Sequence, residues 1–100
     1  MLKYDKDRVF FESNGTIYEL TSQPYEPCLY IKKEGQIIKT IHNAWTTDTL
    51  SEIFQEGGTI EAFNGERYSE KEFCTILEKF IESRKTEADW TYIAKFFKEE

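Results

Sequence analysis

The chain has 100 residues, a formal net charge of −6 and 39% hydrophobic residues. This balance predicts one globular domain rather than a disordered segment. The acidity disfavours nucleic acids and anionic membranes as partners, because binding either one requires clustered Lys and Arg side chains. No apolar run of about 18 residues could span a membrane, and the polar N-terminus does not resemble a signal peptide. Two cysteines are too few for a disulfide framework, so we expect free thiols and a cytoplasmic location.

The first predicted element is a β-hairpin centred on Asn14-Gly15, a dipeptide that favours a two-residue turn. The segments on both sides alternate between apolar and polar residues, as strands with one buried face do. The opposite face is mixed and includes Phe10. The turn gathers four apolar side chains on one face, through the pairs Val9 with Leu20 and Phe11 with Tyr18.

A second hairpin is predicted over residues 28–42, with its turn at Glu34-Gly35. Residues 22–27 connect the two hairpins, because two prolines there interrupt any strand pairing, and Tyr25 lies between them. Both faces of the second hairpin are partly apolar, so the sequence leaves open which face is buried.

The register of the second hairpin decides whether a Cys–His pair can form. A regular ladder from the Glu34-Gly35 turn pairs Cys28 with Ile41 and sets His42 opposite Pro27. Cys28 and His42 then point to opposite faces of the sheet. A nucleophilic dyad of these two residues is therefore not expected.

The second half of the chain is predominantly helical in its pattern. Residues 49–52 have the form of a capping box and predict a short helix over 49–56. Gly57-Gly58 ends that helix, and a strand over 59–63 follows, closed by a second Asn-Gly pair at 64–65. We expect Phe63 to join the core.

Two more helices are predicted. Residues 69–72 form another capping box, which begins an amphipathic helix over 70–83 with Cys74 on its apolar side. A C-terminal helix over 87–98 either completes the core or projects towards a partner. One side of that helix carries Trp90, Ile93, Ala94 and Phe97.

This order of elements predicts an α+β fold that takes up residues 1–100 as a single domain. We expect an antiparallel sheet of about five strands, formed by the two hairpins and the strand over 59–63. Two to three helices pack on one face of this sheet.

The inventory of catalytic side chains is small. His42 is the only histidine, which excludes a zinc site with two histidine ligands, and Cys74 is expected to pack as a small hydrophobe. No calcium loop, phosphate loop or dinucleotide fingerprint occurs. We therefore expect no catalytic residue, no metal, no cofactor and no enzymatic activity.

Sixteen aromatic residues are many for a domain of this size. Rings outside the predicted core faces either plug a gap under a loop or anchor a partner, and the sequence leaves both roles open. The candidate partner-binding residues are Phe10, Tyr25, Tyr30, Trp45 and Trp90.

Small size, acidity and many rings favour a cytoplasmic protein-binding module, whose partner is another protein or a second copy of the chain. An inhibitor of the immunity type, or an anti-defence protein of bacterial or phage origin, would be a specific version. One alternative is a small-molecule-binding or sensory domain with a pocket between sheet and helices. Another is a structural accessory subunit or homo-oligomer.

Overall fold

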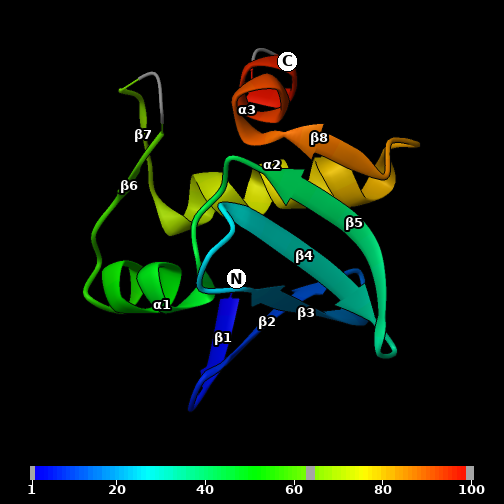
Figure 1. Ribbon diagram of the computed structural model, residues 1–100, viewed down its shortest axis with the longest axis horizontal. Helices are drawn as coiled ribbons and strands as arrows, with labels where there is room; N and C mark the ends of the chain where they lie inside the picture. Colours follow the sequence, from blue (N-terminus) through cyan, green and yellow to red (C-terminus); the bar gives the residue numbers. More distant parts are fainter. Residues whose placement is uncertain (1, 63–64, 99–100) are drawn as a thin grey trace.

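The computed structural model describes residues 2–62 and 65–98, and its elements are labelled in Figure 1. In chain order these are β1 (Leu2–Asp5), β2 (Arg8–Ser13), β3 (Thr16–Ser22), β4 (Cys28–Lys33), β5 (Gln36–His42), α1 (Thr47–Gln55), β6 (Ile60–Glu61), β7 (Arg67–Tyr68), α2 (Glu70–Glu82), β8 (Glu87–Asp89) and α3 (Trp90–Lys98).

Within the described residues, six strands form one sheet in the order β1-β2-β3-β4-β5-β8. Neighbouring strands from β1 to β5 are antiparallel, whereas β8 runs parallel to β5. The sheet is therefore mixed. The α+β class agrees with the expectation, but an antiparallel sheet of about five strands does not.

Both edge strands were missed by the sequence pattern. At one edge, β1 pairs with β2 and places Leu2, only 7% exposed, opposite Phe11. At the other edge, residues 87–89 form β8 instead of the first turn of the C-terminal helix. Asp89 ends this strand by accepting a hydrogen bond on Oδ1 from the backbone N–H of Thr91, at 2.9 Å, which starts α3 three residues later than expected.

The expected strand over 59–63 does not join the main sheet. Among the described residues of this segment, Ile60–Glu61 is the strand, and it pairs with Arg67–Tyr68 in a separate two-stranded ribbon. Ile60 and Tyr68 are opposite each other and fully buried, so the ribbon contributes to the core from outside the sheet. The expected burial of Phe63 concerns a position outside the described residues.

The first hairpin has the predicted register. Phe11 is opposite Tyr18, and Val9 is opposite Leu20. Asn14 and Gly15 have φ angles of 52° and 80°, the left-handed conformation that a two-residue turn of this kind requires. The local sequence was sufficient here because the turn residues and the apolar alternation agree.

The second hairpin has the predicted turn but a different register. Lys33 pairs with Gln36 and Lys32 with Ile37, and then the register shifts at a β-bulge that leaves Ile38 unpaired. Beyond the bulge, Leu29 is opposite Ile41, and both are fully buried. A regular ladder would have turned Ile41 to the other face. Burying the Ile41 side chain contributes about 2 kcal/mol. Ile38, which a regular ladder would turn to this face instead, still packs partly buried against the core, so the bulge keeps contacts of both side chains.

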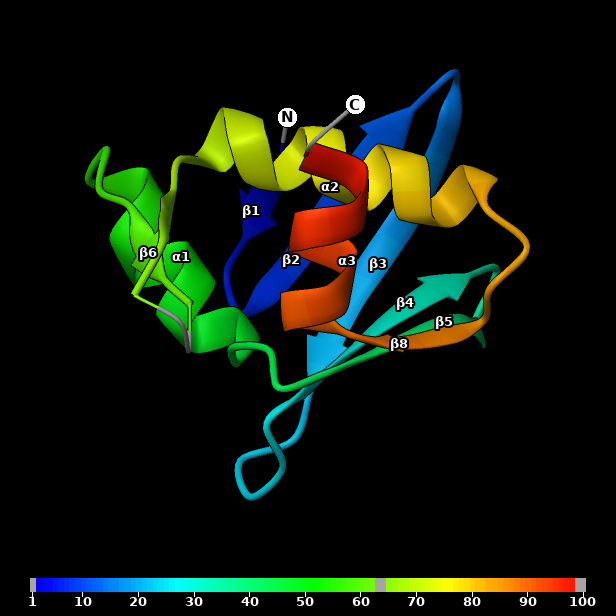
Figure 2. The same ribbon diagram turned by 90° about the horizontal axis from the view of Figure 1, so that it is seen from above.

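The alternation of residues along the strands gives the sheet two different faces. On what we call the covered face, α2 and α3 cross the strands (Figure 2). On what we call the open face, no helix among the described residues packs against the sheet. Covered-face side chains include Val9, Phe11, Leu20, Leu29, Ile31 and Ile41, all buried. Open-face side chains include Phe10, Ile17, Cys28, Tyr30, His42 and Glu87.

The helices begin where side chains cap their free N–H groups. The predicted capping box of α2 is present, since Ser69 and Glu72 each accept a hydrogen bond from the other's backbone N–H. The one predicted for α1 is wrong, because Thr46 rather than Thr49 is the N-cap. Thr46 Oγ1 accepts from the backbone N–H of Thr49 at 3.2 Å, so α1 begins at Thr47 and ends at Gln55.

The C-terminal helix completes the core. Trp90, Ile93 and Ala94 are at most 2% exposed, whereas Tyr92 and Phe96 on the other side are about half exposed. Cys74 is also buried, as expected. The expected burial of Phe97 concerns a side chain outside the described part of the structure.

One charged side chain lies on the covered face. Lys39 is 7% exposed, and its Nζ donates to the backbone carbonyl oxygen of Ser83, at 2.8 Å, and to that of Lys85. Burial lowers the pKa of the Lys39 ammonium. The contacts join β5 to the segment between α2 and β8, where carbonyl oxygens at the end of α2 would otherwise lack donors.

Across residues 2–62 and 65–98, none of the helices combines the length and the apolar character that crossing a bilayer demands.

Candidate functional site

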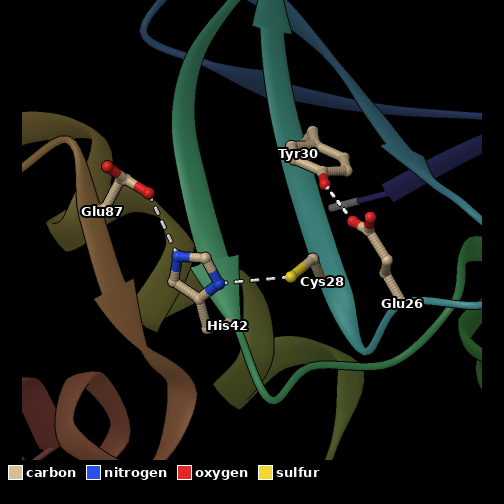
Figure 3. A network of polar contacts seen from close by, with 5 residues as sticks. All are labelled: Glu26, Cys28, Tyr30, His42 and Glu87. Carbon is tan, nitrogen blue, oxygen red and sulfur yellow. Dashed lines mark hydrogen bonds and ion pairs between the residues drawn. The ribbon is translucent and has the colours of Figure 1, made fainter.

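The bulge in the second hairpin brings Cys28 and His42 together on the open face. They are directly paired across β4 and β5, and Cys28 Sγ is 3.2 Å from His42 Nδ1 (Figure 3). The expectation that these residues point to opposite faces is therefore wrong. The error has one physical cause, since the unpaired Ile38 moves every later residue of β5 to the opposite face.

A carboxylate completes the group. Glu87, on the neighbouring strand β8, has its Oε1 3.1 Å from His42 Nε2 (Figure 3). A carboxylate only accepts hydrogen bonds, so Nε2 carries the ring proton and Nδ1 is left as the acceptor that faces the thiol. We call Cys28, His42 and Glu87 the thiol–imidazole–carboxylate site.

The position of Glu87 depends on how β8 is held. The backbone N–H of Thr40 donates to the carbonyl oxygen of Thr86 at 2.8 Å, which fixes the start of the strand. Asn43 donates from its side-chain amide to Asp89 at the other end. The carboxylate thus reaches the ring from a strand anchored at both ends, far from His42 in sequence.

The site is open to solvent. The side chains of His42 and Glu87 are 47% and 67% exposed, and Cys28 is half-buried. Such exposure means that the His42–Glu87 contact contributes little to stability. It also means that a dissolved molecule could reach the thiol without any rearrangement of the fold.

A second polar contact lies beside the thiol. Tyr30 Oη donates to Glu26 at 2.6 Å (Figure 3). This hydrogen bond raises the pKa of Tyr30 to about 12. Tyr30 is therefore a neutral hydrogen-bond donor at physiological pH, next to Cys28 on the same face of β4.

The three side chains are arranged in a line rather than around a point. The thiol contacts one ring nitrogen and the carboxylate contacts the other, whereas a metal requires ligands that converge. Among the described residues, no group of three His, Cys, Asp or Glu side chains could hold a metal ion.

The candidate partner-binding residues from the sequence are not brought together in one place. Phe10 and Tyr30 lie half-buried on the open face. Tyr25 is 94% exposed on the loop between β3 and β4, which projects from the rest of the molecule (Figure 2). Trp90 is 1% exposed and belongs to the core.

Trp45 lies at the edge of the core. Its ring contacts that of Trp90 edge to face, with centroids 4.9 Å apart, and its Nε1 donates to the carbonyl oxygen of Glu61 at 3.2 Å. Trp45 belongs to the segment that joins β5 to α1, and its half-buried ring packs beneath that segment. It also borders a hollow of about 360 Å³ that is lined by Pro27, Asn43, Ala44, Trp45, Glu61 and Ala62.

The open face has an apolar hollow of its own. It measures about 230 Å³ and lies where Phe10 and Ile17 are flanked by Lys3 and Glu12. Ile17 and Ile37 on this face are 58% and 54% exposed. The open face thus offers apolar side chains to solvent across several strands.

The sequence pattern predicts no functional contact for His42 and gives no functional role to Glu87. One signal could have found the pair. A bulge after Ile37 places the apolar Ile41 beside Leu29 on the covered face and the polar His42 on the open face. A regular ladder would place these two side chains the other way round. No local pattern points to Glu87, because its position depends on a long crossover from β5 to β8.

Comparison with known protein families, with characterised proteins and with solved structures gives no significant match to this chain. The functional interpretation therefore rests on the geometry of the open face, of the projecting loop and of the thiol–imidazole–carboxylate site.

Proposed function

We propose that this chain is a small acidic cytoplasmic module that binds another protein, and that its role is binding rather than catalysis. The observation that carries the proposal is the exposure of Tyr25, a residue that is 94% exposed. Large rings at the tip of a projecting loop are typical anchors of protein interfaces.

The loop is suited to present this ring. Pro24 and Pro27 on either side of Tyr25 restrict the backbone, so less conformational entropy is lost when a partner orders it. The same loop leads directly into β4, whose Tyr30 side chain lies on the open face. Tyr25 would serve as the anchor, and Tyr30 and Phe10 would belong to a wider contact surface on the open face.

Charge supports a partner with a basic surface. The chain carries a net charge of −6, and Glu12, Glu26 and Glu87 are exposed on or beside the open face, which also carries Lys3 and Lys32. Such charges steer association and make its rate depend on salt. An inhibitor, an immunity-type protein or an anti-defence protein of bacterial or phage origin fits this description.

The experiment is copurification of the tagged chain from its native host, with Tyr25→Ala compared with Tyr92→Ala. Tyr92 is a matched control, because it is also an exposed tyrosine but lies on α3. We expect Tyr25→Ala to lose a stoichiometric protein partner at an unchanged melting temperature, while Tyr92→Ala retains it. Recovery of the partner with Tyr25→Ala would contradict the proposal.

A second candidate function is favoured by the hollow beside Trp45. Its volume of about 360 Å³ is enough for a small ligand. Native mass spectrometry of the same preparation decides between the two functions. A bound small molecule without a partner protein supports the ligand-binding alternative, and a discrete oligomer of the chain alone supports the structural one.

A further inference from the structure

Cys28, His42 and Glu87 come from three adjacent strands and form one line of contacts on the open face. The distances are 3.2 Å between Sγ and Nδ1 and 3.1 Å between Nε2 and Oε1. We propose that Cys28 is a reactive thiol that exchanges with small-molecule or protein disulfides, with His42 as its proton acceptor and Glu87 as a positioning residue. This inference goes beyond partner binding, because it assigns covalent chemistry to the chain.

The direction of proton movement follows from the donors and acceptors. Glu87 accepts the Nε2 proton, so the lone pair of Nδ1 points at the Cys28 sulfur. When the ring takes the thiol proton, its new positive charge lies against the Glu87 carboxylate, which compensates it. The thiolate is the form of cysteine that attacks, so the ring supplies the nucleophile.

The exchange step is balanced without another reactant. The Cys28 proton passes to His42 Nδ1 while the sulfur attacks one sulfur of the disulfide. A bond forms between these two sulfurs, the original disulfide bond breaks, and its electron pair leaves with the second sulfur. That sulfur takes the proton from the imidazole and departs as a thiol, so Cys28 is oxidised and the leaving sulfur is reduced.

Disulfide exchange fits this site better than acyl transfer does. Acyl transfer builds up negative charge on a carbonyl oxygen and depends on donors placed around that oxygen. Exchange between sulfurs needs only a thiolate, a proton carrier and an open approach. The open face supplies the Cys28 thiol, the His42 ring as proton carrier and an approach from solvent, since Cys28 is half-buried and the His42 and Glu87 side chains are 47% and 67% exposed.

Cys74 provides an internal reference in the same chain. It is 7% exposed, and burial raises its pKa to about 11. Both features oppose reaction at neutral pH. The structure therefore predicts that the two thiols differ strongly, with only Cys28 accessible to a disulfide in the folded protein.

The test follows the reaction of the full chain with oxidised glutathione near neutral pH, by intact mass and peptide mapping. We expect one glutathionyl group, on Cys28. His42→Ala should slow its addition about tenfold, because an unassisted thiol is only a few per cent thiolate at neutral pH. Free imidazole in the buffer should restore part of the lost rate.

Glu87→Gln should slow the reaction severalfold, less than His42→Ala does. Its matched control is Glu12→Gln, which removes an exposed carboxylate from the same face, away from the ring. Each variant is also measured in denaturant, where all should react alike, so a folding defect is distinguished from the loss of assistance. Equal native rates for wild type and His42→Ala, or equal labelling of Cys28 and Cys74, would overturn the proposal.

Discussion

The covered and open faces of the sheet are made by alternate residues of the same strands, yet they differ in what fixes them. On the covered face, Leu29, Ile31 and Ile41 are fully buried against helices. On the open face, Ile17 and Ile37 are more than half exposed. The stability of the fold therefore depends on the first face, and the second face can carry the proposed partner surface and the thiol without loss of core packing.

The largest contrast is expected between two rings of the same helix. Trp90→Ala should lower the free energy of unfolding by about 3–5 kcal/mol, because it empties a site among the rings of Trp45, Tyr68 and Phe73. Tyr92→Ala, at an exposed position of α3, should cost much less. Denaturant unfolding of both variants measures the difference, and similar losses would contradict the placement of α3.

The register of the second hairpin can be tested by a cross-link on the open face. In His42→Cys, the new thiol faces Cys28, so oxidation should close a disulfide that stabilises the fold by about 3 kcal/mol for a loop of this length. Thr40→Cys is the control, since position 40 faces Tyr30 and its thiol should stay free. A disulfide in Thr40→Cys, or none in His42→Cys, would show that the bulge is misplaced.

Two lysines of the same hairpin compare the faces directly. Lys39→Ala should lower the free energy of unfolding by about 1–3 kcal/mol, because the carbonyl oxygens of Ser83 and Lys85 lose their buried donor. Lys32→Ala on the open face should change it by about 0.5 kcal/mol or less. Thermal or denaturant unfolding of both variants is the measurement, and equal effects would place Lys39 outside the core.

Alkaline pH should lower the stability of the fold through the buried Cys74 thiol. The pKa of Cys74 is raised to about 11 in the fold, so the folded state keeps a proton that the unfolded state releases from about pH 8.5 upwards. Stability therefore falls as pH rises, by about 1 kcal/mol from this group near pH 9.5. Cys74→Ala should show a shallower decline over the same range, and an unchanged slope would argue against burial of the thiol.

A similarly small stability effect is expected at the apolar hollow of the open face. Phe10→Ser and Ile17→Ser should each change the free energy of unfolding by about 0.5 kcal/mol, because little apolar area is removed from the core. The same substitutions should weaken binding of the protein partner recovered from the native host. Strong destabilisation without any loss of binding would assign these side chains to the fold rather than to the partner.

Parts of the fold could be predicted where local signals agree. The Asn14-Gly15 hairpin and the capping box at Ser69 are present as the sequence indicates. The short helix was misplaced, because Thr46 competes with Thr49 as N-cap and both positions suit a capping residue. Element types were predicted better than their boundaries, since several residues at a boundary can make the same hydrogen bond.

The candidate partner-binding residues differ in exposure, and the sequence does not distinguish the exposed ones from the buried ones. Tyr25 could be selected because prolines surround it, and its ring is indeed exposed. Trp90 was selected as well, but it is buried, because the residues before it form β8 and set α3 against the core. A ring near the end of a chain carries no local signal that distinguishes these outcomes.

The sequence alone determined the class of the fold, the first hairpin, the long amphipathic helix and the proline-containing loop around Tyr25, since these depend on neighbouring residues. The exposure of Tyr25 was left open by the sequence and is decided by the structure. Only the tertiary structure decided the bulge at Ile38, the parallel strand β8 and the meeting of Cys28, His42 and Glu87. These features depend on contacts between distant parts of the chain. The bulge is favoured because it buries Ile41 against helices that come much later in the sequence. The Glu87 carboxylate reaches the ring only after the chain has crossed back to the sheet edge.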